Sequence, residues 1–154
     1  MDDYYYMKAA ISEAVKGKEE GEVPVGCVVV YEGRIIGKGH NRIEALQDPT
    51  AHAEILAITA AAEYLGNRRL EGCTIYVTLE PCAMCCGAMV LARANKLVFG
   101  AYDPKAGAAV TLYNIPTDKR LNHQLEVVGG FMEDECGGIL TDFFRRLREN
   151  KYIN

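Results

Sequence analysis

Two short segments of this 154-residue chain carry side chains that bind metal ions. The first contains His52, followed two positions later by Glu54, and the second contains Cys82 and Cys85, three positions apart. Imidazole and thiolate are good ligands for zinc, which prefers four tetrahedral partners. Two thiolates and one neutral imidazole leave a fourth position open to water, which is typical of catalytic rather than structural zinc. We therefore expect one catalytic zinc ion per chain, held by His52, Cys82 and Cys85.

Glu54 is the candidate proton carrier of this site. Residues two apart on an ideal helix point about 200° away from each other, so His52 and Glu54 can serve one site only where a helix begins. There the carboxylate needs no contact with the metal. It could take a proton from the bound water, whose pKa zinc lowers to about 7, and hand that proton on. The alternative is that Glu54 only complements the helix dipole.

Other interpretations of these residues stay open. A Cys-x-x-Cys pair also forms redox centres or half of a structural zinc site, and a histidine before an apolar helix is often a cap or a core residue. Cys86 follows Cys82 by four positions and could be a fourth ligand, which would close the site and make it structural. The other cysteines, Cys27, Cys73 and Cys136, lie in apolar surroundings that are typical of a core.

Alternating helices and strands must position these residues. Helical spacing of apolar side chains predicts helices, and β-branched runs between turn residues predict strands. Thr50 can cap the helix that carries His52 and Glu54. The predicted helices span residues 4–20, 51–65, 82–93 and 133–149, and the predicted strands span residues 25–31, 34–39, 74–79, 96–101 and 124–128. A polar loop is expected over residues 40–49, and a long loop, typical of functional segments, over residues 102–122.

This order of elements predicts a three-layer α/β/α sandwich around a mixed five-stranded sheet. The turn at Glu32-Gly33 makes the first two strands an antiparallel hairpin, whereas strand–helix–strand connections pair strands in parallel. No repeat, low-complexity tract or linker interrupts the sequence, so we expect residues 1–154 to form a single domain.

The charge balance excludes a strongly basic nucleic-acid-binding protein, because 17 Lys and Arg face 21 Asp and Glu. The balance still allows a local basic patch. Arg145, Arg146 and Arg148, and Lys105 in the long loop, suit phosphate contacts, although such charges also suit a solvated helix face. The acidic, aromatic N-terminus differs from a secretory signal, and the longest apolar run, residues 82–92, is too short to span a bilayer. We therefore expect a cytoplasmic protein without a membrane segment.

The two metal-binding segments resemble the signature of the zinc nucleobase deaminases. His52-Ala53-Glu54 and Pro81-Cys82-Ala83-Met84-Cys85 match its two parts. Further segments, spread over most of the chain, resemble the bacterial tRNA-specific adenosine deaminases: residues 21–26, 39–42, 48–54, 78–82, 99–103, 121–123 and 142–148. One departure is Val110-Thr111, where that family often has Gly-Ser.

The resemblance implies a cytidine-deaminase-like fold and the zinc-dependent hydrolytic deamination of adenosine to inosine at the wobble position of tRNA. Carried over by position, it implies that His52, Cys82 and Cys85 bind zinc and that Glu54 shuttles protons. It also implies a homodimer that binds the anticodon loop of tRNA.

Substrate contacts are implied for two more residues. Asn41 would hydrogen-bond the flipped nucleotide, and Asp103 would contact its sugar. The signature is less specific for substrate than for chemistry, because cytidine, cytosine and guanine deaminases share it. The alternative enzyme is therefore a deaminase of free nucleobases or nucleosides, and the alternative from another class is a non-catalytic zinc-binding interaction module.

Overall fold

A mixed five-stranded sheet forms the middle of the computed structural model, which describes the backbone of residues 2–153 and the side chains of residues 2–150. The strands are β1 (Gly26–Tyr31), β2 (Arg34–His40), β3 (Cys73–Leu79), β4 (Lys96–Ala101) and β5 (Glu126–Val128). Their order across the sheet is β2-β1-β3-β4-β5. β1 pairs antiparallel with β2 and with β3, whereas β3, β4 and β5 run parallel to one another.

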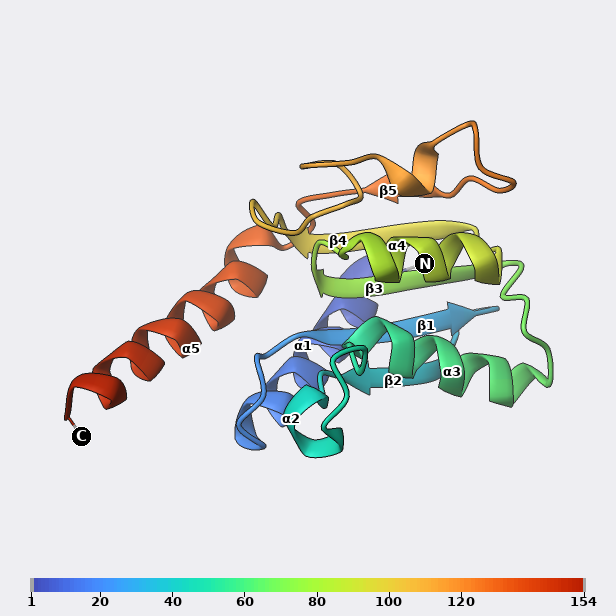
Figure 1. Cartoon of the computed structure of the whole chain (residues 1–154). Helices are drawn as coiled ribbons and strands as arrows, with labels where there is room; N and C mark the ends of the chain where they lie inside the picture. Colours follow the sequence, from blue (N-terminus) through green and yellow to red (C-terminus); the bar gives the residue numbers. More distant parts are fainter. Residues whose placement is uncertain (1, 154) are drawn as a thin grey trace.

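Helices cover both faces of this sheet (Figure 1). The helices are α1 (Asp3–Glu19), α2 (Ile43–Leu46), α3 (Ala53–Leu65), α4 (Ala83–Ala92) and α5 (Glu133–Ile153), and a short 3-10 helix, η1, spans Ile115–Thr117. α3 and α4 enclose one core with the sheet, and α1 and the start of α5 enclose a second core on the opposite face. The predicted three-layer sandwich with a mixed sheet is confirmed.

The inner strands are apolar on both sides because both of their faces are covered. In β1, Cys27 and Val29 belong to the core under α3 and α4, while Val28 and Val30 belong to the core under α1. Alternate residues of a strand point to opposite faces. The continuous β-branched run in the sequence therefore reflects an inner strand. β3 pairs with it on one side and β4 follows beyond β3, and the C-terminal ends of β3 and β4 lead to the candidate site.

A seam of small residues brings α3 unusually close to β2. On the strand side, Gly37 and Gly39 have no Cβ; a Cβ at Gly37 would meet the Ala61 nitrogen at 2.8 Å, and one at Gly39 would meet the Ala57 nitrogen at 2.8 Å. Ala57 and Ala61 are fully buried. Side chains therefore do not separate the two layers here, and the backbone of β2 sets the position of the helix that begins after His52.

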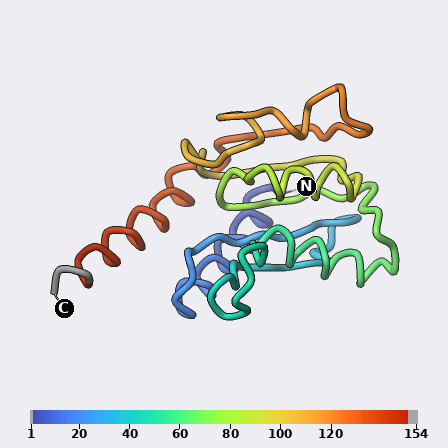
Figure 2. The backbone as a smooth tube through the Cα atoms, viewed as in Figure 1, coloured from blue at the N-terminus to red at the C-terminus, as the bar shows by residue number. Residues whose placement is uncertain are grey.

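α5 leads away from the three layers, so that the later turns of this helix lie apart from the sheet (Figures 1 and 2). Its first residues pack on the sheet, with Cys136 buried in the second core, whereas Phe144 and the residues after it, as far as Asn150, are exposed. None of the helices described within residues 2–153 is both long enough and apolar enough to cross a membrane.

Three details of the predicted elements are wrong. The polar loop expected over residues 40–49 contains the single-turn helix α2, whose backbone N–H groups at Glu44 and Ala45 donate to the buried Glu22 carboxylate. The residue at the N-cap of α3 is His52 rather than Thr50, because the Thr50 backbone and hydroxyl both donate to Asp48. β5 is also shorter than expected, beginning at Glu126.

Candidate active site

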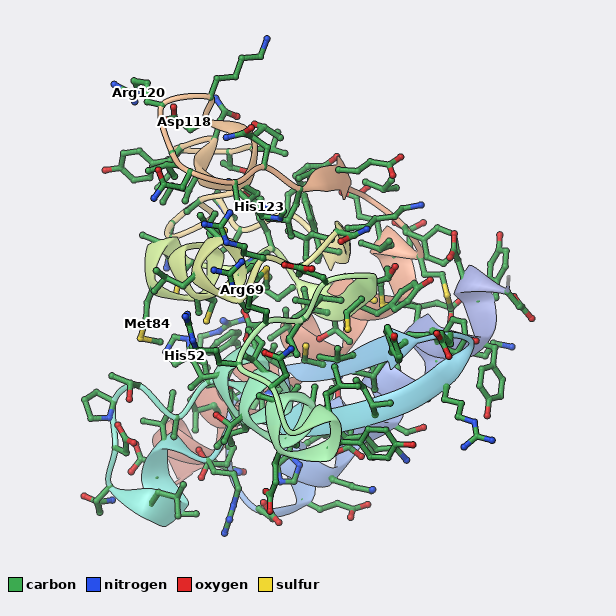
Figure 3. All side chains as sticks on the ribbon, turned by 90° about the vertical axis from the view of Figure 1, so that its right-hand side faces the viewer. His52, Arg69, Met84, Asp118, Arg120 and His123 are labelled. Atoms are coloured by element: carbon green, nitrogen blue, oxygen red, sulfur yellow. The ribbon has the colours of Figure 1, made fainter. Side chains whose placement is uncertain are left out.

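The starts of α3 and α4 lie together and bring the two metal-binding segments into one place. His52 is the N-cap residue of α3, and Cys82 is the N-cap residue of α4; both have extended backbone angles, and neither side chain makes a capping hydrogen bond. Cys85 follows in the first turn of α4. His52 and Met84, a neighbour of Cys85, lie on the same side of the molecule in Figure 3. The three donors are therefore free to face one another.

The geometry of this group suits a metal ion. The His52 Nδ1 atom lies 3.7 Å from the Cys82 sulfur and 3.6 Å from the Cys85 sulfur. Among the side chains described, those of residues 2–150, these are the three whose ligand atoms gather within 4.8 Å of one another. Zinc binds sulfur at about 2.3 Å and imidazole nitrogen at about 2.0 Å. An ion between the donors therefore needs only small shifts of the side chains.

The two sulfurs differ in their acidity. The neighbouring Cys85 and His52 side chains lower the pKa of Cys82 to about 3, so Cys82 is a thiolate at neutral pH. The same contact with Cys82, together with burial, raises the pKa of Cys85 well above its ordinary value. A dication reverses the second effect, because a coordinating thiol is deprotonated outright. The donor set thus fits a soft dication such as zinc.

Glu54 lies in the first turn of α3, beside this group and away from water. Its side chain is only 4% exposed, and burial raises the pKa of Glu54 to about 7. A group with a pKa near the operating pH both accepts and releases a proton readily. Glu54 lines the same cavity as His52 and Cys82, as the first-turn argument from the sequence requires.

Cys86 lies next to the donor group but is directed elsewhere. It is fully buried within the core under α3 and α4, and its sulfur donates to the Pro81 carbonyl oxygen at 3.5 Å. Burial raises the pKa of Cys86 above its ordinary value, which disfavours the thiolate that a metal requires. The other three cysteines that the sequence places in the core, Cys27, Cys73 and Cys136, are buried as expected.

A cavity of about 180 Å³ opens over the donor group. Its lining residues are Val23, Val25, Asn41, His52, Glu54, Leu79, Glu80, Cys82, Asp103 and Ala106. Asn41 is 7% exposed. Its Oδ1 accepts the Ala53 backbone N–H at 2.9 Å, and its Nδ2 donates to the Val23 carbonyl oxygen at 3.2 Å. Since an amide nitrogen carries two N–H donors, Asn41 both caps α3 and keeps a donor for the cavity.

Asp103 also lines the cavity and lies at the start of the long loop. Its Oδ1 accepts the backbone N–H groups of Lys105 and Ala106, which folds the loop into a turn. Asp103 is also shared with a neighbouring groove of about 440 Å³, lined by Val23, Leu79, Tyr102, Asp103, Pro104, Lys105, Leu140 and Phe144. The groove leads from the cavity toward α5.

The basic residues singled out in the sequence lie around this groove or beyond it. Lys105 lines the groove, and Phe144 of α5 lines it from the other side. Arg145 and Arg146 are exposed and form ion pairs with Asp142 at 2.6 and 3.2 Å, respectively. Arg148 is exposed one turn further along α5. The structure therefore places Lys105 at the groove beside the site. The three arginines lie further out, on the projecting part of α5.

Two buried carboxylates near the site have no role predicted from the sequence. Glu22 and Glu80 are each 2% exposed. Glu22 holds α2 and Glu80 holds the long loop, in both cases by accepting backbone N–H groups. Their signal in the sequence is an acidic residue near the end of an apolar strand: Glu80 directly follows β3, and Glu22 precedes β1 by four positions. The donors that they bind lie more than 20 positions away, so local patterns do not reveal them.

Comparison with known proteins agrees with this geometry. The MafB19-like deaminase family matches residues 1–148. A tRNA-specific adenosine deaminase of Bacillus subtilis (strain 168) is 56% identical over 149 residues, which cover 97% of this chain and 92% of that protein. A solved structure from studies of A-to-I editing by tRNA:A34 deaminases superposes with a TM-score of 0.86 at 43% identity, covering 89% of this chain and 99% of that chain. A guanine deaminase structure from Bacillus subtilis has a TM-score of 0.63 at 38% identity, and the match covers 66% of each chain.

Proposed function

Because this chain belongs to the MafB19-like deaminases and, within them, to the family of the tRNA-specific adenosine deaminases, we propose that it deaminates adenosine to inosine at the wobble position of tRNA. Water replaces the 6-amino group of adenine, and ammonia leaves. The observation that carries this assignment is the buried carboxylate of Glu54 in one small cavity with His52, Cys82 and, lining it, Asn41. A structural metal site has no need of such a carboxylate.

We propose that His52, Cys82 and Cys85 hold one zinc ion. Bound there, zinc polarises water and makes it a nucleophile at neutral pH. Cys86 remains in the core and leaves the fourth position to the reaction. The starts of α3 and α4 both face this point, and the positive ends of helix dipoles stabilise the two thiolates and the negative charge that develops during attack.

Glu54 carries the protons of the reaction. Its carboxylate takes a proton from the attacking water and gives it to the adenine ring nitrogen N1 as the water oxygen bonds to C6, so that C6 becomes tetrahedral. The second proton reaches the departing amino nitrogen by the same carboxylate, and the C6–N6 bond breaks. Burial serves both transfers, because it keeps the pKa of Glu54 near 7 and bulk water away from the carboxylate.

The cavity and the groove bind different parts of the substrate. The cavity of about 180 Å³ is smaller than the roughly 300–1,000 Å³ typical of sites for drug-sized ligands, so it takes a single flipped base. A deaminase extrudes its target base into such a pocket. Asn41 donates to that base and Asp103 contacts its sugar, while the groove beside them takes the adjoining nucleotides. Lys105, Arg145, Arg146 and Arg148 contact phosphates of the anticodon loop.

The assembly and location follow from the same assignment. Leu91 of α4 is 80% exposed, and exposed Leu112, Tyr113 and Leu121 follow in the loop whose η1 turn packs against α4. Exposed apolar patches of this kind mark interaction surfaces, and we place the homodimer contact here. Residues 1–154 act as one deaminase domain, and we place the enzyme in the cytoplasm together with its tRNA substrate.

The basic residues give a test of the tRNA assignment. We expect reversal of Arg145, Arg146 and Arg148 to Glu to weaken tRNA turnover and to make the plot of log affinity against log salt shallower by about 2 units, because each single-strand phosphate contact adds about 0.7 to that slope. Zinc content, measured by atomic absorption, should not change. The control reverses Arg34, Arg68 and Arg69, which are exposed and include two beyond the far end of α3. If the salt dependence of affinity became equally shallow in the control, the arginines of α5 would have no specific contact with the RNA.

The second candidate is deamination of a free base, which the likeness to the guanine deaminase favours. One preparation of the enzyme decides between the two. We expect inosine in tRNA with release of ammonia, and no comparable ammonia release from guanine, cytosine or adenosine. Efficient release from guanine, with tRNA unchanged, would establish the free-base enzyme instead.

A further inference from the structure

Glu80 is a buried acidic residue that the proposed chemistry does not use. It is 2% exposed, lies two positions before Cys82 and lines the cavity. Within the described residues 2–150, the ion pairs include none that joins Glu80 to Lys, Arg or His. A buried carboxylate without a cation is costly unless hydrogen bonds satisfy it. Its partners therefore identify what it stabilises.

All four hydrogen bonds to Glu80 come from one loop. Oε1 accepts the Asp103 backbone N–H at 3.0 Å and the Thr111 hydroxyl at 2.5 Å. Oε2 accepts the backbone N–H groups of Val110 and Thr111, both at 2.9 Å. An ionised carboxylate offers about four acceptor positions, so the loop fills them. Glu80 thus holds the two ends of the segment from Asp103 to Thr111 with a single side chain.

The segment that Glu80 holds forms a wall of the site. Asp103 and Ala106 line the cavity, and Pro104 and Lys105 line the adjoining groove. Pro81, the residue after Glu80, holds the same segment by a further hydrogen bond: its carbonyl oxygen accepts the Ala108 N–H at 2.9 Å. Residues 80 and 81 therefore fix the wall, and residue 82 directly follows them at the proposed metal centre.

Gly107 shows how closely the segment is fitted around this carboxylate. A Cβ at Gly107 would collide with the Glu80 carboxylate and would lie 2.6 Å from the Asp103 carbonyl oxygen. The Gly107 N–H donates to that same Asp103 oxygen at 3.0 Å. The turn thus wraps the Glu80 side chain without room for another atom, and the position of the wall depends on the position of the carboxylate.

We propose that Glu80 is a positioning residue for the substrate: it fixes the segment from Asp103 to Thr111 against the cavity and so determines how tightly the nucleotide is held. The proposal rests on the proposed function, since it takes the cavity as the nucleotide site. Glu80 does not touch the reacting atoms. Its loss should therefore act on substrate binding rather than on the proton transfers of Glu54.

Kinetics of Glu80→Gln test this role. The amide replaces one acceptor oxygen by N–H donors, which face the N–H groups of the loop. A hydrogen bond to a charged group contributes about a factor of ten or more, so we expect KM for tRNA to rise about tenfold or more while kcat falls much less. Glu22→Gln is the matched control, because Glu22 is equally buried and also accepts two backbone N–H groups, but those belong to α2.

Thr111 supplies a conservative rescue. Thr111→Val keeps the shape of the side chain but removes the hydroxyl that donates to Glu80, and we expect KM to rise. Thr111→Ser retains that hydroxyl and should stay near the parent. The proposal is wrong if Glu80→Gln lowers kcat without raising KM, if Glu22→Gln raises KM equally, or if Thr111→Ser behaves like Thr111→Val.

Hydrogen exchange separates this proposal from the proposed function. The amides of Asp103, Val110 and Thr111 should exchange faster in Glu80→Gln than in the parent and in Glu22→Gln, with no substrate present. Unchanged protection of these amides would overturn the role of Glu80 whatever the enzyme acts on. A parent protein that leaves tRNA unchanged, but shows the expected exchange pattern, would instead overturn the substrate assignment and keep the attachment of the loop.

Discussion

α3 and α4 both begin at the cavity, and both place at their N-cap a side chain that makes no capping hydrogen bond. N-cap positions favour Ser, Thr, Asp and Asn, whose oxygen accepts a backbone N–H of the first turn. Here His52 and Cys82 stand at these positions. Each helix therefore gives up a stabilising residue at its start so that a metal ligand can occupy the place where the dipole is positive.

The two helix starts differ in what they contribute and in what supports them. α4 contributes two sulfurs from its own first turn, whereas α3 contributes one nitrogen and the Glu54 carboxylate. α3 has an external cap, since Asn41 accepts the Ala53 N–H at 2.9 Å. The difference indicates that α4 is specialised for holding the metal and α3 for moving protons, and three measurements can test this division.

The largest effect on activity should come from the start of α4, which holds the metal. We expect Cys82→Ala to reduce zinc from about one ion per chain to a small fraction, with loss of activity, because a structural or catalytic zinc site depends on each of its few protein ligands. Cys86→Ala, one turn later on the same helix, should retain the metal. If Cys86→Ala removes zinc as completely as Cys82→Ala, the site is closed and the comparison between the two helix starts fails.

The second largest effect should come from the start of α3, which carries the proton carrier Glu54. Glu54→Gln should retain zinc and the fold but lower turnover by about 10²–10⁴-fold or more, since general acid–base groups contribute this much for each role and Glu54 serves several transfers. Glu63→Gln, at an exposed position of the same helix, should leave turnover unchanged. Single-turnover kinetics of inosine formation measure both variants. Near-normal turnover of Glu54→Gln would show that α3 contributes only the metal ligand His52 and no proton carrier.

The smallest effect should come from the external cap. Asn41→Ala should lower the free energy of unfolding by about 1 kcal/mol, the typical value for loss of an N-cap acceptor, and should raise KM as a contact to the base is lost. The control is Asn67→Ala beyond the other end of α3, where the Asn67 side chain accepts the exposed Arg69 N–H. Denaturant titrations of the zinc-loaded proteins compare the two. Equal stability of Asn41→Ala and the parent would show that α3 needs no cap.

The sequence is sufficient for elements whose causes are local. β4 begins and ends at the predicted residues 96 and 101, because its short apolar run, which includes Val98 and Phe99, lies between polar residues. The three proposed metal ligands, too, come from two short motifs whose spacing specifies helix starts. α2 was missed because one turn of helix has no periodicity, and the carboxylate that holds it, on Glu22, lies more than 20 positions away.

The same distinction explains what the sequence did not reveal at the site. Asn41 was predicted to touch the substrate, but its bonds to Ala53 and Val23, which fix its orientation, connect residues 12 and 18 positions apart. Thr50 has a residue type suited to an N-cap, yet Asp48 takes both of its donors. Glu80 was part of a recognised motif, and only the fold shows that its partners lie 23 to 31 positions later.

The seam of Gly37 and Gly39 against the alanines of α3 limits how this protein can change over generations. Neither position accepts even a methyl group without displacing the helix backbone, and the facing alanines can grow only by moving the same backbone. A single substitution at either glycine therefore displaces the helix, which disfavours stepwise change at these positions. The distal part of α5, exposed and projecting, carries no such restriction. We therefore expect changes in substrate preference to accumulate along the distal part of α5, while the layer that positions His52 and Glu54 stays fixed.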